Sequence, residues 1–345
     1  MLLKERGFFR RANRRRTYLG LLGAVALAAC SNGAAYAQSA VVPTLAPVVV
    51  TGVLPGPALW KVSKGNHVMW VLGLASPLPK NMQWKSAEVE SRIASSQAVL
   101  KLPSLEIGVR TSFYRSSMMP SARELETNPN QQTLQDVLTP ALYQHWRVLK
   151  ARYLGDDDRV ERMRPIVAGR ELYEAALGHA GLVDDDGLEK IVYRAAVHDG
   201  IASVNTSYQL LLKDPREAVR SLSNASMNDQ YCLSQVLDAL DHGLVQATVR
   251  ANAWATGDIG ALRSILSQVQ QDSCLSTLDG SQFAMALGIN DIESRVRKSW
   301  IDSAEQAIDK NKQTFAVLPI HELLAPDGYL GALQANGYAV QAPDQ

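Results

Sequence analysis

The chain has 345 residues, a formal net charge of +1 and 20% charged residues, with 46% hydrophobic residues. Length and composition of this kind are typical of a globular protein. The near-neutral balance provides no basic excess to neutralise phosphates, so we expect no nucleic-acid partner.

The N-terminal segment has the parts of a bacterial export signal. Arginines at positions 10, 11 and 14–16 precede an apolar run from Tyr18 to Ala29, and Ala35–Tyr36–Ala37 has the pattern of a cleavage site. The run is too short to span a bilayer, which takes roughly 20 residues. The sequence therefore predicts a signal peptide over residues 1–37 and export to the periplasm. Arg15–Arg16 also resembles a twin-arginine signal, which would imply export after folding.

A second processing pattern overlaps the first. Leu27–Ala28–Ala29–Cys30 matches a lipobox, in which Cys30 is acylated and residues 1–29 are removed. The mature protein is then either soluble in the periplasm or a lipoprotein of the outer membrane. Its lipid anchor at Cys30 would be its sole membrane contact. Residues 38–55 are small, apolar and proline-containing, which predicts a disordered leader before a single domain over residues 56–345.

The two remaining cysteines are Cys232 and Cys274. In an oxidising compartment they are expected to form a disulfide. Closing a loop of about forty residues would stabilise the fold by about 4 kcal/mol in the chain-entropy model. Two buried free thiols are the alternative.

The first expected elements form a β-hairpin. Leu59–Val62 and Val68–Leu72 are rich in strand-forming residues, and Gly65 between them suits a tight turn. A helix over roughly 86–97 is expected to begin at Ser86 as its N-cap. Val99–Leu102 then has the composition of a buried strand.

The middle of the chain is predominantly helical. Thr139–Pro140 is a strong helix start, and Gly155 is a suitable stop. Further elements are predicted at 165–180, 186–199, 228–256, 258–266 and 290–312 (helices), 201–205 (strand), and at Asp214–Glu217 (a helix cap).

The C-terminal part returns to strands. Phe315–Leu318 is a buried strand, followed by a loop through His321, a helix from about Pro326 to Ala335 and a strand over Tyr338–Val340. Strands at both ends with helices between them predict an α/β fold. Its mixed central sheet would combine N- and C-terminal strands around a large helical insertion.

Several segments in this order resemble one protein family. They are Gly56–Val62, Leu78–Pro79, Trp84, Met163–Arg164–Pro165, Ala253–Asp258, Phe315–His321, Asp327–Leu330 and Gly337–Tyr338. Together they are similar to the TraB/GumN family, relatives of the Tiki metal-dependent proteases. The resemblance implies that family's α/β fold over most of residues 56–341.

In Tiki-like enzymes the metal chemistry is attributed to two Gly-x-x-His loops with supporting acidic residues. This chain departs from that pattern, with Ser76 where the first His is expected, Lys101 where an acid is common and Asn205 where a Glu is usual. The last loop keeps His321 but lacks the Gly, and the family's Arg-Asn pair is matched only by Arg295–Val296. One His cannot hold a divalent ion usefully, so we expect that the ancestral metal cofactor is lost.

Alternatives remain for these residues. Ser76 could be a nucleophile with His321 as its base, although no nucleophile-elbow motif is present. The plainer interpretation is a loop serine that caps a backbone group and a His packed at a strand end. Two triple-aspartate runs, 156–158 and 184–186, lack the ligand spacing of a calcium loop and are expected to cap helices.

Two functions are therefore predicted. The first is an exported, non-catalytic binding or interaction protein of the cell envelope that uses the ancestral cleft for an unknown ligand or protein. The alternative is a periplasmic hydrolase, metal-dependent or based on Ser76 and His321, that acts in the same cleft. Ser76, Lys101 and Asn205 argue against the metal enzyme.

Overall fold

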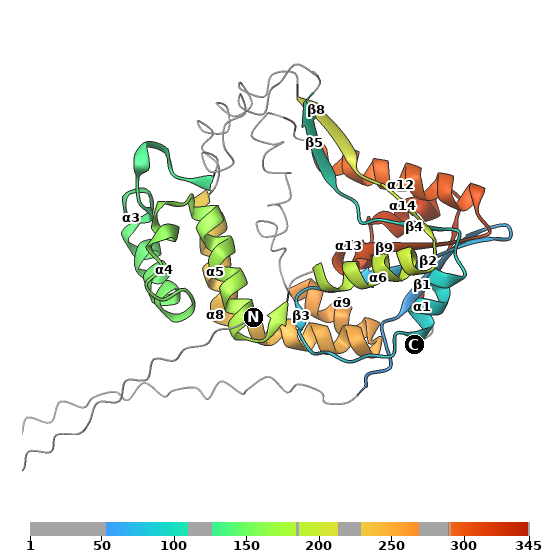
Figure 1. Cartoon of the computed structure of the whole chain (residues 1–345), viewed down its shortest axis with the longest axis horizontal. Coiled ribbons are helices and arrows are strands. Elements are labelled where there is room, and N and C mark those ends of the chain that lie inside the picture. The colour runs from blue at the N-terminus through green and yellow to red at the C-terminus, as the bar shows by residue number, and fades with distance from the viewer. Residues whose placement is uncertain are drawn as a thin grey trace, which may run out of the picture. The chain divides into compact units, whose positions relative to one another are not determined.

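The computed structural model describes residues 53–109, 126–183, 186–212, 229–268, 289 and 291–343. A six-stranded sheet with the order β10-β1-β2-β9-β4-β7 lies at its centre (Figure 1). Its strands are β1 (Leu59–Lys64), β2 (His67–Leu74), β4 (Ala98–Leu100), β7 (Ala202–Val204), β9 (Gln313–Pro319) and β10 (Ala339–Gln341). The predicted mixed sheet of N- and C-terminal strands is confirmed.

The sheet has an antiparallel edge and a parallel remainder. β1 pairs antiparallel with both β10 and β2, and Gly65 turns the β1–β2 hairpin with a φ of +61°. β2, β9, β4 and β7 all pair parallel with their neighbours. The carboxyl ends of these four strands therefore lie at one edge of the sheet, where binding sites of open α/β sheets usually form.

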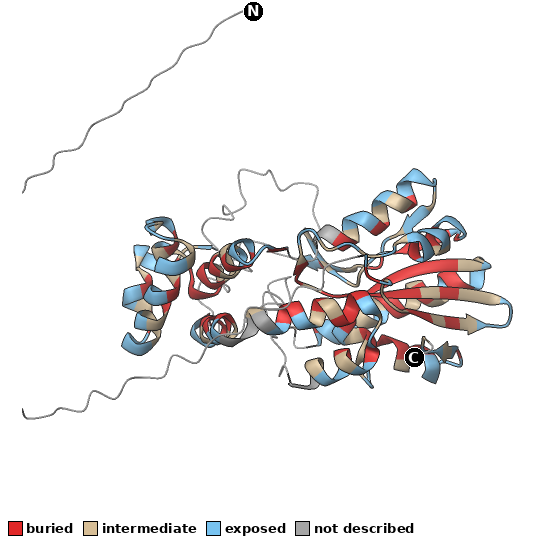
Figure 2. Cartoon of the chain, turned by 90° about the horizontal axis from the view of Figure 1, so that it is seen from below, coloured by how far each residue is buried: buried red, intermediate tan, exposed pale blue. Residues whose placement is uncertain are grey.

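Helices cover the parallel strands. α12 (Ile292–Lys310) contacts β2, β4 and β9, α1 (Ala87–Ala94) contacts β9, and α6 (Asp186–His198) contacts α1 and β7. α14 (Tyr329–Ala335) lies against α12. Five consecutive residues of β9, from Thr314 to Leu318, are fully buried, as expected for a parallel strand that is covered on both faces. Figure 2 shows buried residues along the strands of the sheet.

The helical insertion has a core of its own. It contains α3 (Leu134–Val137), α4 (Pro140–Tyr153), α5 (Pro165–His179), the start of α8 (Asp229–Thr256) and the 3-10 turns Pro129–Gln131 and Asp158–Arg162. Trp146, Leu149, Leu172 and Leu233 are fully buried there. α8 continues from this core toward the sheet, where it contacts α9 (Ile259–Gln268) and β3 (Leu78–Pro79). One helix thus belongs to both cores.

Some local predictions differ from the structure. Thr139 caps α4 as expected, since its Oγ1 accepts from the backbone N of Leu142 at 3.4 Å. Ser86 occupies the N-cap of α1, but its side chain makes no capping hydrogen bond. The predicted loop through His321 is wrong, because Ile320–Leu324 forms the short helix α13. The cap predicted at Asp214–Glu217 lies outside the described residues.

Two small sheets were not predicted. β5 (Leu105–Val109) pairs parallel with β8 (Tyr208–Leu212), and β3 pairs antiparallel with β6 (Leu182–Val183). Before β1, Leu54 is buried and forms an isolated bridge with Trp84. Among the helices of the described residues, we find none that combines the length and the apolar character needed to cross a membrane.

Candidate functional site

The four candidate residues all follow carboxyl ends of the parallel strands. The register pairs Leu74 of β2 with Pro319 of β9, and Leu100 of β4 with both Ala316 of β9 and Val204 of β7. Within two residues of these strand ends lie, in order across the sheet, Ser76, His321, Lys101 and Asn205. We call this row of positions the strand-end edge.

β2 and β9 approach each other closely at this edge. A Cβ atom added at Gly73 would overlap Cδ1 of Ile320 and lie 3.5 Å from its Cα. Ile320 is buried and begins α13, directly before His321. The absence of a side chain at Gly73 therefore allows the backbone that carries His321 to pack against the end of β2.

α8 holds the segment after β2 with two side chains one helical turn apart. Nε1 of Trp254 donates a hydrogen bond to the carbonyl oxygen of Gly73 at 2.6 Å, and Nη2 of Arg250 donates to that of Ser76 at 2.7 Å. Trp254 is buried and packs edge-to-face on Trp84, with 5.6 Å between ring centroids. The position of Ser76 is thus set by α8 as well as by the sheet.

Glu322 and Arg250 act on His321 through their charges, and Arg297 in turn pairs with Glu322. Arg297 of α12 has its Nη2 3.6 Å from Oε2 of Glu322 and donates from Nη1 to the carbonyl oxygen of Asp327 at 3.0 Å. Nε2 of His321 lies 3.9 Å from Oε1 of Glu322. Arg250 is near enough for its charge to affect His321. This half of the strand-end edge carries two guanidinium groups and one carboxylate, an excess of positive charge.

The environment disfavours protonation of His321. Desolvation by the surrounding protein lowers its pKa, the positive charge of Arg250 lowers it further, and the carboxylate of Glu322 raises it. The side chain itself keeps 55% of its surface exposed, so ligands can still reach the ring. The surroundings therefore favour the neutral imidazole, which has one nitrogen able to donate and one able to accept.

Lys101 and Asn205 belong to a separate polar group. Nδ2 of Asn205 donates to Oε1 of Glu106 at 3.1 Å, and Gln209 donates to the other carboxylate oxygen. The Lys101 ammonium lies 5.7 Å from the centroid of the Tyr193 ring. Hydrogen bonds from Gln209, Ser207 and Asn205 lower the pKa of Glu106, with a smaller contribution from Lys101. The strand-end edge thus divides into a Ser76–His321 half and a Lys101–Asn205 half.

These residues do not fit a divalent metal ion. The first half offers one imidazole and one carboxylate, and that carboxylate already faces Arg297. In the second half Lys101 is a cation, and the one acid, Glu106, is held by amide donors. A search of the described residues for three or more His, Cys, Asp or Glu side chains grouped as metal ligands finds none. A metal site needs several such donors with open positions.

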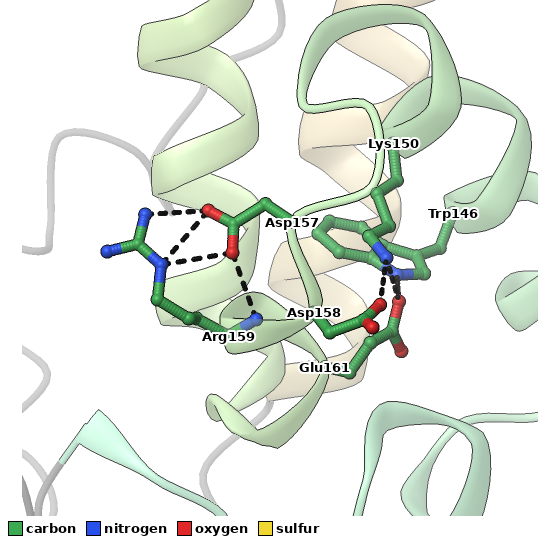
Figure 3. Close-up of polar contacts among 6 residues, drawn as sticks. All are labelled: Trp146, Lys150, Asp157, Asp158, Arg159 and Glu161. Carbon is green, nitrogen blue, oxygen red and sulfur yellow. Dashed lines mark hydrogen bonds and ion pairs between the residues drawn. The ribbon is translucent and has the colours of Figure 1, made fainter.

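The first aspartate run forms ion pairs (Figure 3). Asp157 accepts from the backbone N of Arg159 at 3.0 Å and pairs with the Arg159 guanidinium at 2.7 Å. Arg159 lowers the pKa of Asp157 to about 2. The Lys150 ammonium lies between Asp158 and Glu161, at 3.3 Å and 3.2 Å. The positive charge of Lys150 at this place would repel a calcium ion. In the second run, residues 184 and 185 lie outside the described residues.

Sequence reasoning missed Arg250, Arg297 and Glu106. Their partners lie far away in sequence, as the 174 positions between Arg250 and Ser76 show. The resemblance to the family's Arg-Asn pair pointed to Arg295. Its guanidinium instead donates hydrogen bonds to the Asp291 carboxylate and to the hydroxyl of Tyr208. For the cysteines, Cys232 is buried beside Ile166 and Val167, while Cys30 and Cys274 lie outside the described residues.

Comparison with known proteins gives one match. The family model described as the TraB/PrgY/gumN family matches residues 58–342, which is most of the chain. No curated protein and no solved structure matches. The matched range includes every strand of the central sheet and all four positions of the strand-end edge.

Proposed function

Because the chain belongs to the TraB/PrgY/gumN family, we propose that it is a member without metal-hydrolase activity that binds a ligand at the strand-end edge. One observation carries this proposal. The positions at the ends of β2, β4, β7 and β9 hold a hydroxyl, an ammonium, an amide and a single imidazole. A divalent ion would meet repulsion from Lys101 and too few donors elsewhere.

The same edge remains suited to binding. Its side chains follow strands that are fixed by the sheet, and loops on a rigid scaffold are common sites of recognition. α8 adds hydrogen bonds to the segment after β2. The acid beside His321 is paired with Arg297, and Arg250 adds a positive charge. A preorganised surface of this kind loses little conformational entropy when a ligand binds.

The proposal is tested by metal titration and hydrolysis assays on the same purified protein. We expect no saturable binding of manganese, zinc or cobalt, and no cleavage of peptide or ester substrates when these ions are added. The double substitution Ser76→His and Asn205→Glu, which restores the two family residues, serves as the matched comparison. If the unaltered chain binds one ion per molecule and cleaves a peptide only with that ion, the proposal is wrong.

The place of action in this proposal is the cell envelope. The basic and apolar N-terminal segment with its two alternative cleavage patterns supports export. Fractionation would test it, since cytoplasmic retention of the processed chain would contradict it. Palmitate labelling of the unaltered chain and of Cys30→Ser distinguishes a lipoprotein from a soluble form. A Cys232–Cys274 disulfide is part of the same proposal, and two titratable thiols under denaturing, non-reducing conditions would rule it out.

A serine hydrolase is the second candidate. It is favoured by the adjacency of β2 and β9, which brings the segments of Ser76 and His321 to neighbouring strand ends, and by the lowered pKa of His321, which leaves an imidazole able to accept a proton. Ester hydrolysis that is lost in both Ser76→Ala and His321→Ala would support it. Hydrolysis that is unchanged in either variant would refute it.

A further inference from the structure

Arg250 of α8 reaches the strand-end edge through its hydrogen bond to the Ser76 segment. It is partly buried, and its Nε is shielded from solvent with no hydrogen-bond partner among the described residues. Its one hydrogen bond there goes from Nη2 to the carbonyl oxygen of Ser76. Within the part of the chain that the structure describes, no carboxylate lies within ion-pair distance of it. A guanidinium withdrawn from water without an opposing charge costs free energy.

The neighbouring Arg297 also has a shielded Nε without a hydrogen-bond partner among the described residues, but its charge is opposed by a carboxylate. Its guanidinium faces the Glu322 carboxylate at 3.6 Å, donates to the Asp327 carbonyl and lies 5.6 Å from the centroid of the Tyr329 ring. Glu322 is therefore engaged by Arg297. The positive charge of Arg250 has no carboxylate partner of its own among the described residues.

We infer that Arg250, with His321 beside it, binds a carboxylate group of the ligand. The inference rests on the proposed function, because it names the chemistry recognised at the same edge. Arginine presents several donors in one plane, which suits the two oxygens of a carboxylate. His321 is 55% exposed and can add a neutral donor.

The three charged side chains described here favour a monoanion. Arg250, Arg297 and Glu322 sum to one positive charge when His321 is neutral, and a single carboxylate opposes it. Inorganic phosphate near neutral pH carries more than one negative charge and would leave an excess beside Glu322. In a cell envelope the carboxylate could come from a peptide C-terminus or from an acidic sugar, so both are included as probes.

The test follows the imidazole signal of His321 by NMR in the chain expressed from its full-length sequence. The probes are N-acetyl-dialanine and its C-terminal amide, glucuronate and glucose, and inorganic phosphate. We expect at least one acid to shift the signal saturably, and its neutral counterpart to leave it unchanged. Equal binding of an acid and its neutral counterpart, tighter binding of phosphate, or no binding of either acid would overturn the inference.

Variants assign the binding to named groups. Arg250→Gln keeps an amide donor near Ser76 but removes the charge, and should weaken acid binding about 10-fold or more, as expected for loss of a hydrogen bond between charged groups. Binding to this variant is measured by calorimetry, with the concentration of folded protein matched to that of the unaltered chain. Arg152→Gln, on the exposed surface of α4, is the control and should bind as the unaltered chain does. Unchanged affinity in Arg250→Gln would refute the assignment.

His321→Gln provides a second variant in case Arg250→Gln does not fold. It alters an exposed side chain and should weaken acid binding by a few-fold, and unchanged affinity would remove His321 from the site. Metal binding and hydrolysis are measured on the same samples. A protein that is metal-free and inactive but does not bind either acid contradicts this inference alone. A protein that binds a metal stoichiometrically and cleaves a peptide contradicts the proposed function.

Discussion

Gly73→Ala is the substitution that most directly probes the contact between the ends of β2 and β9. The added methyl group would overlap Cδ1 of Ile320, a residue that is 4% exposed and so has little room to move. The backbone of Ile320 is also near, with its Cα 3.5 Å from the added Cβ. The clash is therefore not relieved by a simple rotation into solvent.

The magnitude follows from two opposing terms. Overpacking a filled core costs about 1–3 kcal/mol, while replacing Gly by Ala restricts the unfolded chain and returns about 0.4–1 kcal/mol. We expect a net loss of about 1–2 kcal/mol in the free energy of unfolding. Ile320→Val removes Cδ1 itself and should cost about 0.5–1.5 kcal/mol alone.

The double variant tests the reasoning. Gly73→Ala with Ile320→Val exchanges one methyl group for another at the same place, so its stability should lie within about 1 kcal/mol of the unaltered protein. Urea unfolding of all four proteins measures the coupling. Gly178→Ala in α5, where an added Cβ meets nothing within 4 Å, is the control and should stabilise by about 0.5 kcal/mol. Additivity of the two single effects within about 0.5 kcal/mol would refute the predicted clash.

Three further predictions concern single contacts. Trp254→Phe leaves the Gly73 carbonyl without the Trp254 donor and should lower the free energy of unfolding by about 1–3 kcal/mol. Trp70→Phe should lower it less, because Nε1 of Trp70 has no partner among the described residues. Equal losses in the two variants would contradict this prediction. In an NMR titration, Arg250→Ala should raise the pKa of His321 and Glu322→Gln should lower it, because these two charges act in opposite directions. A lower pKa in Arg250→Ala, or a higher pKa in Glu322→Gln, would be inconsistent with the described site. Asp229→Ala breaks the ion pair with Arg164, which is 2.8 Å long with both side chains 10% exposed, and should lower the free energy of unfolding by about 3–5 kcal/mol. Asp302→Ala breaks the exposed pair with Lys298 and should lower it by less than about 1 kcal/mol. Similar urea midpoints for the two variants would refute the difference.

Local signals predicted most of the regular elements. Gly65 marked the β1–β2 turn, and Thr139–Pro140 marked the start of α4, because these residues act through their own backbone preferences and nearest neighbours. The parallel pairing of β5 with β8 was not predicted. It joins Leu105 to Tyr208, and such a distant partner leaves no trace in the local pattern. The five residues of α13 are likewise too few to show a helical period.

The candidate site could be predicted only in part. Family resemblance pointed to Ser76, Lys101, Asn205 and His321, whose positions follow from the order of strand and loop in the chain. It could not show that Asn205 bonds to Glu106 or that Arg250 reaches the Ser76 carbonyl. Those contacts depend on how α8 and the β5–β8 ribbon pack, which one sequence does not specify locally.

Metal content tests the central claim most directly. The protein is purified from the envelope of expressing cells without chelators, and its manganese, zinc and cobalt are measured by elemental analysis against protein concentration. We expect far less than one ion of any kind per chain. One tightly held ion per chain, lost when His321 is replaced by Ala, would show that the strand-end edge is a metal centre and would contradict the account.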